Sequence, residues 1–277
     1  METKLVLLGT GTPNACPDAS GPASAVVVGD RAYLVDFGPG VVRQASKVYY
    51  KGVDALRPDL LTVAFCTHLH TDHTAGLTML LKYHKNVKVY APQTVAHALE
   101  RAAAGIEERL VPIPVGESVA LKNFTLTAFP TMHDTPESVG YVLAGENARF
   151  GVCTDTGCVT AEMYDALAGC DAAVIEANHD IDMLRTGRYP VCLKRRILSE
   201  RGHLSNEDCA KFACALAKTG VKTFVLGHLS RENNRPRLAE TAVREALDGE
   251  GFSAVTLCVA PAEGDLELEV TPCCASN

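Results

Sequence analysis

The chain reads His68-Leu69-His70-Thr71-Asp72-His73 directly after the apolar run Leu60–Cys66. Three imidazoles and one carboxylate within six residues are donors that borderline divalent metals prefer. Because residues two apart in an extended segment point the same way, we expect His68 and His70 to bind one ion together. Asp72 and His73 stand where the pattern turns helical, so they can face a second ion.

Further ligand-type residues follow three short apolar or β-branched runs, each of which predicts a strand. Thr131-Met132-His133-Asp134 follows the run Phe124–Phe129, and Asp155 follows Arg149–Thr154. His228 follows Lys222–Leu226. Taken alone, His133 or His228 would be an ordinary loop histidine, but their recurrence at strand ends predicts one shared metal site.

Together these motifs resemble the metallo-β-lactamase superfamily. The resemblance implies an α/β (α+β) fold, a four-layer αββα sandwich in a single domain over residues 1–277, with two divalent metal ions at one edge. It implies that His68, His70 and His133 hold one ion, that Asp72, His73 and His228 hold the other, and that Asp155 bridges them. Asp36, in Leu34-Val35-Asp36-Phe37-Gly38, matches the acidic residue that orients ligands without touching the metal.

Composition sets the limits of this interpretation. A chain of 277 residues that is 47% hydrophobic can bury a substantial core. No apolar run is long enough to span a membrane, and the first residues are too short for a signal-peptide core. The 11 cysteines form no C-x-x-C pair, which suits reduced thiols in a cytoplasmic protein. We therefore interpret Cys153 and Cys158, which flank Asp155, as packing residues, and Cys273-Cys274 have no evident role.

Strands and helices alternate, and the pattern starts again near Asn123. The predicted strands, besides those named above, are Lys4–Leu8, Ala25–Val28 and Ala32–Val35. The predicted helices are Val41–Lys51, Thr94–Ala104, Thr160–Ala168, Ser205–Lys218 and Arg237–Leu247. Gly9-Thr10-Gly11-Thr12-Pro13 is glycine-rich but lacks the G-K-[ST] ending of a phosphate-binding loop. We expect no nucleotide site there.

The spacing between motifs narrows the family. His133 and Asp155 are 22 residues apart, too close for the protruding arm of typical tRNase Z enzymes. Asp155 and His228 are 73 residues apart, without room for a β-CASP domain. The sequence between Asp155 and His228 resembles the YycJ/WalJ branch in two segments, Glu176-Ala177-Asn178-His179-Asp180 and Gly202-His203-Leu204-Ser205-Asn206. The resemblance continues in the segment after His228. That branch is implied to be a DNA exonuclease. The Gly9–Pro13 opening instead resembles tRNase Z and arylsulfatase-type enzymes.

Charge points in two directions. The net charge of −7 argues against a nucleic-acid partner, since phosphate contacts need clustered cations. Between Arg185 and Arg201, however, Glu200 is the only acid among six cations, and a local basic segment can bind phosphate on an acidic protein. A solvated helix face is the alternative. We predict substrate contacts by Arg185, Arg188, Lys194, Arg195, Arg196, Ser205 and Asn206.

The ligand set predicts the chemistry. Two divalent ions would deprotonate a bridging water and neutralise charge on a phosphate. We expect Asp72, Asp155 and His203 to be catalytic, with His203 as phosphate contact or general acid, before a helix that Ser205 or Asn206 could cap. His179 also matches the branch but receives no role, and His84 and His97 are interpreted as structural.

Three function classes remain open, because one fold hosts many chemistries. A phosphodiesterase or nuclease, with DNA favoured over RNA, fits the basic segment. A tRNase Z-like RNA endonuclease, an alternative within this first class, fits the opening motif. A small-molecule hydrolase (lactonase, thioesterase, cyclic-nucleotide or arylsulfatase-type) fits the opening motif and the acidic charge. A non-catalytic metal-binding module is disfavoured by the complete ligand set. The set accepts zinc, manganese or iron, and oligomeric state is not encoded in any motif.

Overall fold

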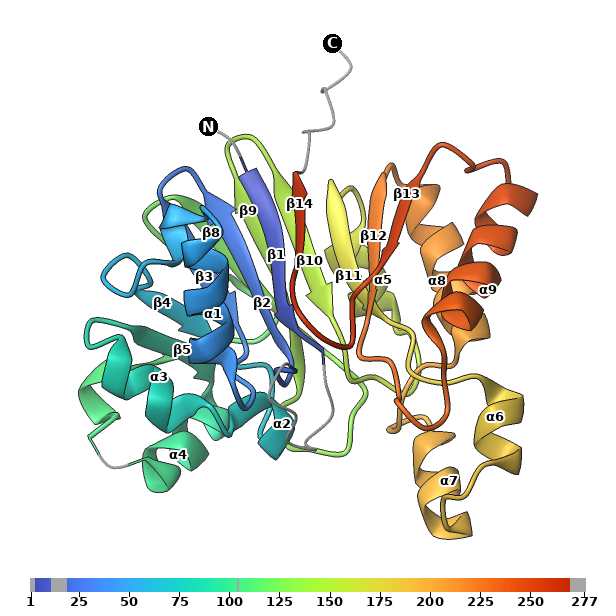
Figure 1. Cartoon of the computed structure of the whole chain (residues 1–277), viewed down its shortest axis with the longest axis horizontal. Coiled ribbons are helices and arrows are strands. Elements are labelled where there is room, and N and C mark those ends of the chain that lie inside the picture. The colour runs from blue at the N-terminus through green and yellow to red at the C-terminus, as the bar shows by residue number, and fades with distance from the viewer. Residues whose placement is uncertain (1–2, 11–18, 104, 270–277) are drawn as a thin grey trace. The chain divides into compact units, whose positions relative to one another are not determined.

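The computed structural model describes residues 3–10, 19–103 and 105–269. These residues form two compact units (Figure 1). The first contains the described residues within 1–119, Thr135–Val139 and Pro261–Glu269, and the second contains Ala120–Asp134 and Gly140–Ala260. The boundary near Val119 agrees with the predicted restart near Asn123. The prediction of one domain over 1–277 stays a prediction. Residues Gly11–Pro13 and Cys273-Cys274 lie outside the described residues.

A seven-stranded mixed sheet forms the first unit, in the order β14-β1-β2-β3-β4-β5-β6. Its strands pair antiparallel from β14 to β3 and parallel from β3 to β6. The bounds are β1 Thr3–Gly9, β2 Ala23–Val28, β3 Arg31–Val35, β4 Val63–Phe65, β5 Lys88–Pro92, β6 Leu110–Ile113 and β14 Leu266–Glu269. Parallel β3 and β4 send their carboxyl ends to one edge of the sheet, which places Asp36 and His68 near each other in the fold.

Helices bury an apolar stripe against this sheet. In α1 (Val41–Tyr50) the buried positions are Val41, Gln44, Ala45 and Val48, the spacing of one helix face. The other helices of the unit are α2 Thr71–Thr74, α3 Leu77–Tyr83 and α4 Gln93–Ala102, with short 3-10 turns at Asp54–Leu56 and Glu107–Arg109. Their core is contiguous and includes Leu34, Phe37 and Leu80.

The second unit has its own seven-stranded sheet, in the order β13-β12-β11-β10-β9-β8-β7. Its strands are β7 Ser118–Ala120, β8 Phe124–Pro130, β9 Val139–Gly145, β10 Arg149–Cys153, β11 Ala172–Glu176, β12 Thr223–Gly227 and β13 Thr256–Val259. Strands β10 to β13 are parallel. Every residue of β11 is buried, as expected for an inner strand of a parallel sheet.

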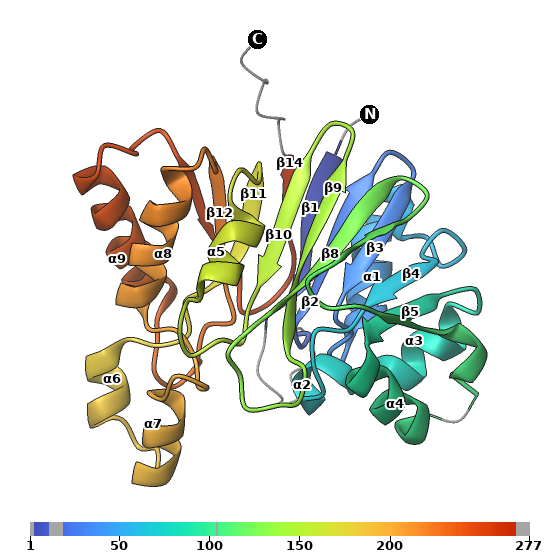
Figure 2. The ribbon, with the colours of Figure 1, turned by 180° about the vertical axis from the view of Figure 1, so that it is seen from behind.

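The helices of the second unit fall into two groups. Helices α5 (Ala161–Leu167), α8 (Asn206–Ala217) and α9 (Pro236–Gly249) pack on the sheet, as Figure 2 shows from behind. Helices α6 (Ile181–Thr186) and α7 (Val191–Ile197) extend past the carboxyl end of β11. We call this pair, Ile181–Ile197, the basic arm. It contains five of the six cations of the predicted basic segment, all except Arg201.

The predicted α/β class is confirmed, and the predicted elements agree with the observed ones to within about two residues at each end. One difference concerns the run Leu60–Cys66, of which only Val63–Phe65 pairs as β4. Its last residues continue as an extended loop, and this loop carries His68.

Candidate metal centre

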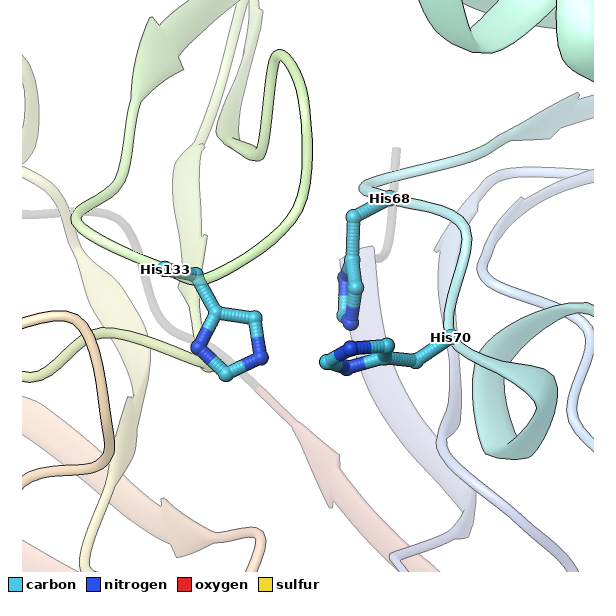
Figure 3. A group of neighbouring side chains, drawn as sticks. All are labelled: His68, His70 and His133. Carbon is cyan, nitrogen blue, oxygen red and sulfur yellow. The ribbon is translucent and has the colours of Figure 1, made fainter. Parts of the chain in front are cut away.

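In the first unit, the cluster His68–His73 spans the loop after β4 and the short helix α2. The rings of His68 and His70 meet edge to face with centroids 4.9 Å apart (Figure 3), as their spacing of two residues predicts. The rings of His68 and His73 are 4.2 Å apart. Nε2 of His73 lies 3.8 Å from Oδ2 of Asp72. All four predicted ligands of this unit therefore belong to one group.

Asp36 holds two of these histidines. Its Oδ2 lies 2.8 Å from Nδ1 of His73 and accepts a hydrogen bond from the Thr67 hydroxyl at 2.8 Å. Because the Thr67 hydrogen is used on Asp36, its oxygen accepts from Nδ1 of His68, 2.9 Å away. Asp36 therefore orients His73 directly and His68 through Thr67. This geometry supports the predicted orienting role of Asp36.

The backbone around this group is closely packed. The amide of Phe37 donates to the carbonyl of His73 at 2.9 Å, and the amide of Gly76 donates to the carbonyl of Phe37 at 2.8 Å. Gly38 is required here, because a Cβ at that position would lie 2.3 Å from the carbonyl oxygen of Asp72. The loop after β3 and the helix α2 are thus held together as one support.

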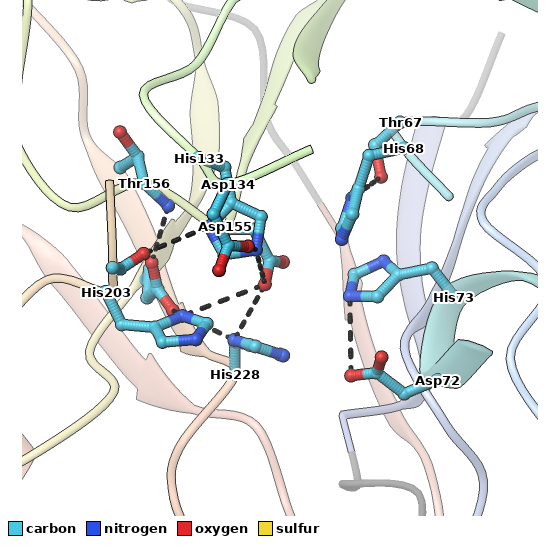
Figure 4. Close-up of polar contacts among 12 residues, drawn as sticks. Thr67, His68, Asp72, His73, His133, Asp134, Asp155, Thr156, His203 and His228 are labelled. Atoms are coloured by element: carbon cyan, nitrogen blue, oxygen red, sulfur yellow. Dashed lines mark hydrogen bonds and ion pairs between the residues drawn. The ribbon is translucent and has the colours of Figure 1, made fainter. Parts of the chain in front are cut away.

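In the second unit, three predicted ligands lie beyond the ends of alternate strands of the sheet: His133 after β8, Asp155 after β10 and His228 after β12. Oδ1 of Asp155 lies 3.6 Å from Nε2 of His133 and 3.5 Å from Nδ1 of His228 (Figure 4). Nδ1 of His203 is 3.8 Å from the same oxygen. The structure therefore brings His133, Asp155 and His228 together, as the strand-end pattern predicts, and places His203 beside them.

Glu176, the last residue of β11, lies at the base of this second group and is fully buried. Its Oε1 lies 2.7 Å from Nδ1 of His203 and 2.9 Å from Nδ1 of His228. Its Oε2 accepts from the amide of Thr156 at 2.9 Å. Burial alone would raise the pKa of the Glu176 carboxyl, but the charge and hydrogen bond of His203 and the hydrogen bond of His228 lower it to about 2. The carboxylate is therefore ionised at neutral pH.

His133 is oriented by a backbone carbonyl. Its Nδ1 lies 3.0 Å from the carbonyl oxygen of Gly202, and its own carbonyl accepts from Nε of Arg201 at 3.0 Å. Burial lowers the pKa of its imidazole. A neutral ring that donates through Nδ1 presents the lone pair of Nε2, the form that binds metal.

The same rule holds for four histidines. His68, His73, His133 and His228 each engage Nδ1 with a hydroxyl, carboxylate or carbonyl oxygen. Nε2 is therefore the nitrogen of each ring that is left to bind a metal. With Asp72 and Asp155, the donor set is imidazole nitrogen and carboxylate oxygen, which fits zinc, manganese or iron.

Backbone strain coincides with these positions. Among the residues that the structure describes, four that are not glycine have positive φ: Asp36 at 61°, Glu137 at 50°, Asp155 at 60° and His228 at 56°. Such left-handed conformations are unfavourable for residues with a Cβ and persist only where the surroundings impose them. Three of the four are residues of the predicted site.

The basic segment divides into two groups of side chains. Nε of Arg196 contacts Oδ2 of Asp134, Arg201 contacts the His133 carbonyl, and Nζ of Lys194 donates to the carbonyl of Arg185 at 2.7 Å. Arg185, Arg188 and Arg195 are exposed. For these three, no side-chain hydrogen bond or ion pair is observed within residues 3–10, 19–103 and 105–269.

Ser205 and Asn206 are buried and have partners inside the protein. Ser205 caps α8 by accepting from the amide of Asp208 at 3.1 Å, as predicted. Asn206 exchanges hydrogen bonds of 3.0 and 2.8 Å with Asn234. The substrate contact predicted for both residues stays a prediction.

Histidines outside the ligand set differ in their surroundings. His84 is buried and lies 3.1 Å from the carbonyl of Pro58, in keeping with a structural role. His179 is 1% exposed, and neither of its ring nitrogens has a hydrogen-bond partner among the described residues. Burial lowers the pKa of His179 to about 4. Cys153, beside Asp155, is buried in the core of the second unit, which agrees with its predicted packing role.

Glu176 and Thr67 had no predicted role. The signal for Glu176 was present, since it ends the apolar run Ala172–Ile175 just as the ligands follow theirs. Thr67 had no signal in the pattern. A threonine beside a histidine is common, and its role depends on Asp36, which is 31 residues away.

Comparison with known proteins identifies the class. A family model described as the beta-lactamase superfamily domain matches residues 31–229, so the chain belongs to this superfamily, and it is a hydrolytic enzyme of that class. The predicted metallo-β-lactamase fold is confirmed. The chain is similar to exodeoxyribonuclease YycJ of Bacillus anthracis, with 33% identity over 225 residues that cover 80% of this chain and 83% of that protein.

Two further similarities bear on the fold and on the branch. Ribonuclease Z of Mycobacterium bovis is 45% identical over 74 residues, 27% of this chain and 24% of that enzyme. The crystal structure of the metallo-beta-lactamase fold protein YhfI from Bacillus subtilis superimposes with a TM-score of 0.73 at 14% identity, covering 97% of this chain and 100% of that one. Within the described part of the chain, no helix has the length and apolar character needed to cross a membrane.

Proposed function

We propose that this protein is a phosphodiesterase that uses two divalent metal ions to hydrolyse nucleic acid, with DNA favoured over RNA. The observation that carries the proposal is the double hydrogen bond to Oε1 of Glu176. One buried carboxylate oxygen orients His228, a proposed metal ligand, and His203, which lies outside the ligand set. A histidine that is oriented next to the proposed metal ligands, but is not itself one of them, is suited to act on the substrate.

The proposed ligands are those that the sequence predicts. His68, His70 and His133 would hold one ion, Asp72, His73 and His228 would hold the other, and Asp155 would contribute to both. Support comes from within each unit, where the Nδ1 contacts leave Nε2 as donor. When bound, two such ions supply a hydroxide at neutral pH and neutralise phosphate charge. Asp155→Ala should therefore cost more bound metal than any single histidine variant.

His203 has the position of a phosphate contact or general acid. Its ring is 17% exposed, whereas Glu176 beneath it is fully buried. The Glu176 carboxylate holds the ring at Nδ1, so Nε2 is the nitrogen that would contact a phosphate oxygen or the leaving oxygen. Asp72 and Asp155 would act in catalysis only through the metals that they bind.

Substrate class rests on the basic arm and on the relatives. Arg185, Arg188 and Arg195 offer three exposed cations on one projecting element, and phosphate backbones bind through such cations. The related proteins of similar length are named exodeoxyribonucleases, which favours DNA. The short match to Ribonuclease Z makes RNA endonuclease activity the second candidate.

Free cysteines at eight described positions suit a cytoplasmic protein.

The deciding experiment uses metal-reconstituted protein and end-labelled single- and double-stranded DNA, RNA of the same sequence and bis-p-nitrophenyl phosphate. We expect metal-dependent shortening of DNA that is abolished in Asp155→Ala. Faster cleavage of RNA would favour the endonuclease. Hydrolysis of lactones, thioesters, cyclic nucleotides or aryl sulfates with both polymers left intact would contradict the proposal and leave a small-molecule hydrolase.

A further inference from the structure

The end of α7 and the segment between α7 and α8 contact the loop that carries His133. Three contacts join them: the Arg196 guanidinium with the Asp134 carboxylate, Nε of Arg201 with the His133 carbonyl at 3.0 Å, and Nδ1 of His133 with the Gly202 carbonyl at 3.0 Å. All partners lie in the second unit. Two cations of the basic segment therefore face the ligand loop.

Packing makes this segment rigid. The amide of Gly202 donates to the Ser199 carbonyl at 2.8 Å, and the amide of His203 donates to the Ile197 carbonyl at 3.0 Å. A Cβ on Gly202 would lie 2.2 Å from the Ile197 carbonyl oxygen. Gly157, two residues after Asp155, is packed closely against the same segment, since a Cβ there would lie 2.3 Å from the carbonyl oxygen of Ser199. The carbonyl of Gly202 is thus fixed in place by backbone on both sides.

We propose that Arg201, together with the Gly202 carbonyl, is a positioning element for His133 and sets the metal affinity of the site. The inference rests on the ligand role of His133 in the proposed function. The Gly202 carbonyl selects the ring form that donates through Nδ1, and Arg201 holds the backbone from which the ring extends. These two contacts, at Nδ1 and at the carbonyl of His133, hold both its ring and its backbone.

This assignment divides the basic segment by function. Arg196 and Arg201 act on the ligand loop, whereas Arg185, Arg188 and Arg195 face solvent on the basic arm. Arg201 touches neither metal nor substrate in this scheme, so its loss should change metal affinity and leave polynucleotide affinity nearly unchanged.

The test measures the dissociation constant for Mn²⁺ or Zn²⁺ by titration calorimetry on metal-free protein, without nucleic acid. Arg201→Met should weaken binding by about 10- to 100-fold, the usual cost of losing a group that orients a ligand. Arg201→Lys should recover part of the affinity, because its ammonium can still donate one hydrogen bond to the carbonyl. Arg188→Met, an arm cation without an observed partner in the described residues, is the matched control and should bind metal as the parent does.

Thermal unfolding of the metal-free variants separates positioning from general damage, and Arg201→Met should unfold within a few degrees of the parent. Unchanged metal affinity in Arg201→Met would overturn the proposal. An equal loss in Arg188→Met would overturn it too, because the effect would then follow charge alone. Since no substrate is present, failure of the nuclease proposal would leave this result interpretable.

Discussion

Nδ1 of His203 lies 2.7 Å from Oε1 of Glu176, a fully buried carboxylate at the end of the inner strand β11. The pair joins two parts of the sequence that are 27 residues apart. The carboxylate accepts a hydrogen bond from the backbone amide of Thr156 at 2.9 Å. This contact holds the carboxylate in position to orient the imidazole of His203. His203 can therefore act on a substrate without reorganising its own support.

His203→Ala should keep both metals and lose catalysis. Removal of a general acid or charged phosphate contact typically costs about 100- to 10,000-fold in rate. The loss should shrink on a nitrophenyl ester, whose leaving oxygen needs no proton. Metal analysis and kinetics on both substrates check this, and a variant that lost metal would show that His203 is a ligand or supports one.

Asp36→Ala and Glu176→Ala should each weaken metal binding by about 10- to 100-fold, because each carboxylate orients ligand histidines. Their responses to excess metal should differ. Among the described residues, the Asp36 side chain bonds to Thr67 and to the proposed ligand His73, so saturating metal should restore most of the turnover in Asp36→Ala. Glu176→Ala also loses the support of His203 and should stay slow. Equal recovery of both variants in a metal titration of kcat would contradict the separate role given to Glu176.

The exposed arginines of the basic arm should govern polynucleotide affinity. Replacing Arg185, Arg188 or Arg195 singly by Gln should weaken binding and lower the slope of log K against log salt by about 0.7 to 0.9 for each phosphate that the variant no longer neutralises. Arg237→Gln, an exposed arginine of α9, is the matched control. Turnover of bis-p-nitrophenyl phosphate should not change. Arg196 is excluded from this series, because it pairs with Asp134.

Buried His179 should make the metal-free protein sensitive to mild acid. Its pKa falls from 6.5 to about 4 in the folded protein, so the unfolded chain binds the proton more tightly and the free energy of unfolding falls as pH drops below about 6.5. At about 1.4 kcal/mol per pKa unit, the loss at pH 5 is about 2 kcal/mol. Urea unfolding at pH 5 and pH 8 should show a smaller difference in His179→Leu. An identical difference in parent and variant would assign the acid sensitivity elsewhere.

Much of the site could be predicted from sequence because its donors follow strand ends. Strands that run in the same direction end at the same edge of a sheet, so the strand-end residues His133, Asp155 and His228 could be grouped from the sequence pattern. His68 and His70 followed from the two-residue period of extended chain. Strand and helix ranges could be predicted because apolar periodicity shows which face of an element is buried.

Contacts between distant side chains could not be predicted in this way. The sequence shows that Arg196 and Arg201 are cations in a basic segment. Their contacts with Asp134 and His133 depend on the tertiary structure around α7. Glu176 ends a strand as the ligands do, yet its acceptance of two imidazoles depends on segments 27 and 52 residues further along the chain. The sequence pattern identifies the residue types that can bind a metal, and the packing of the folded chain determines which residue each of them contacts.

Titration of metal-free protein with Mn²⁺, following bound metal and hydrolysis of end-labelled DNA in the same samples, tests the central claim most directly. The proposal predicts two bound equivalents, with hydrolysis rising to its maximum as the second equivalent binds and disappearing on chelation. Full hydrolysis at one equivalent would contradict the two-ion site. Two bound equivalents with intact DNA and RNA, in a protein that hydrolyses a small ester, would contradict the nuclease.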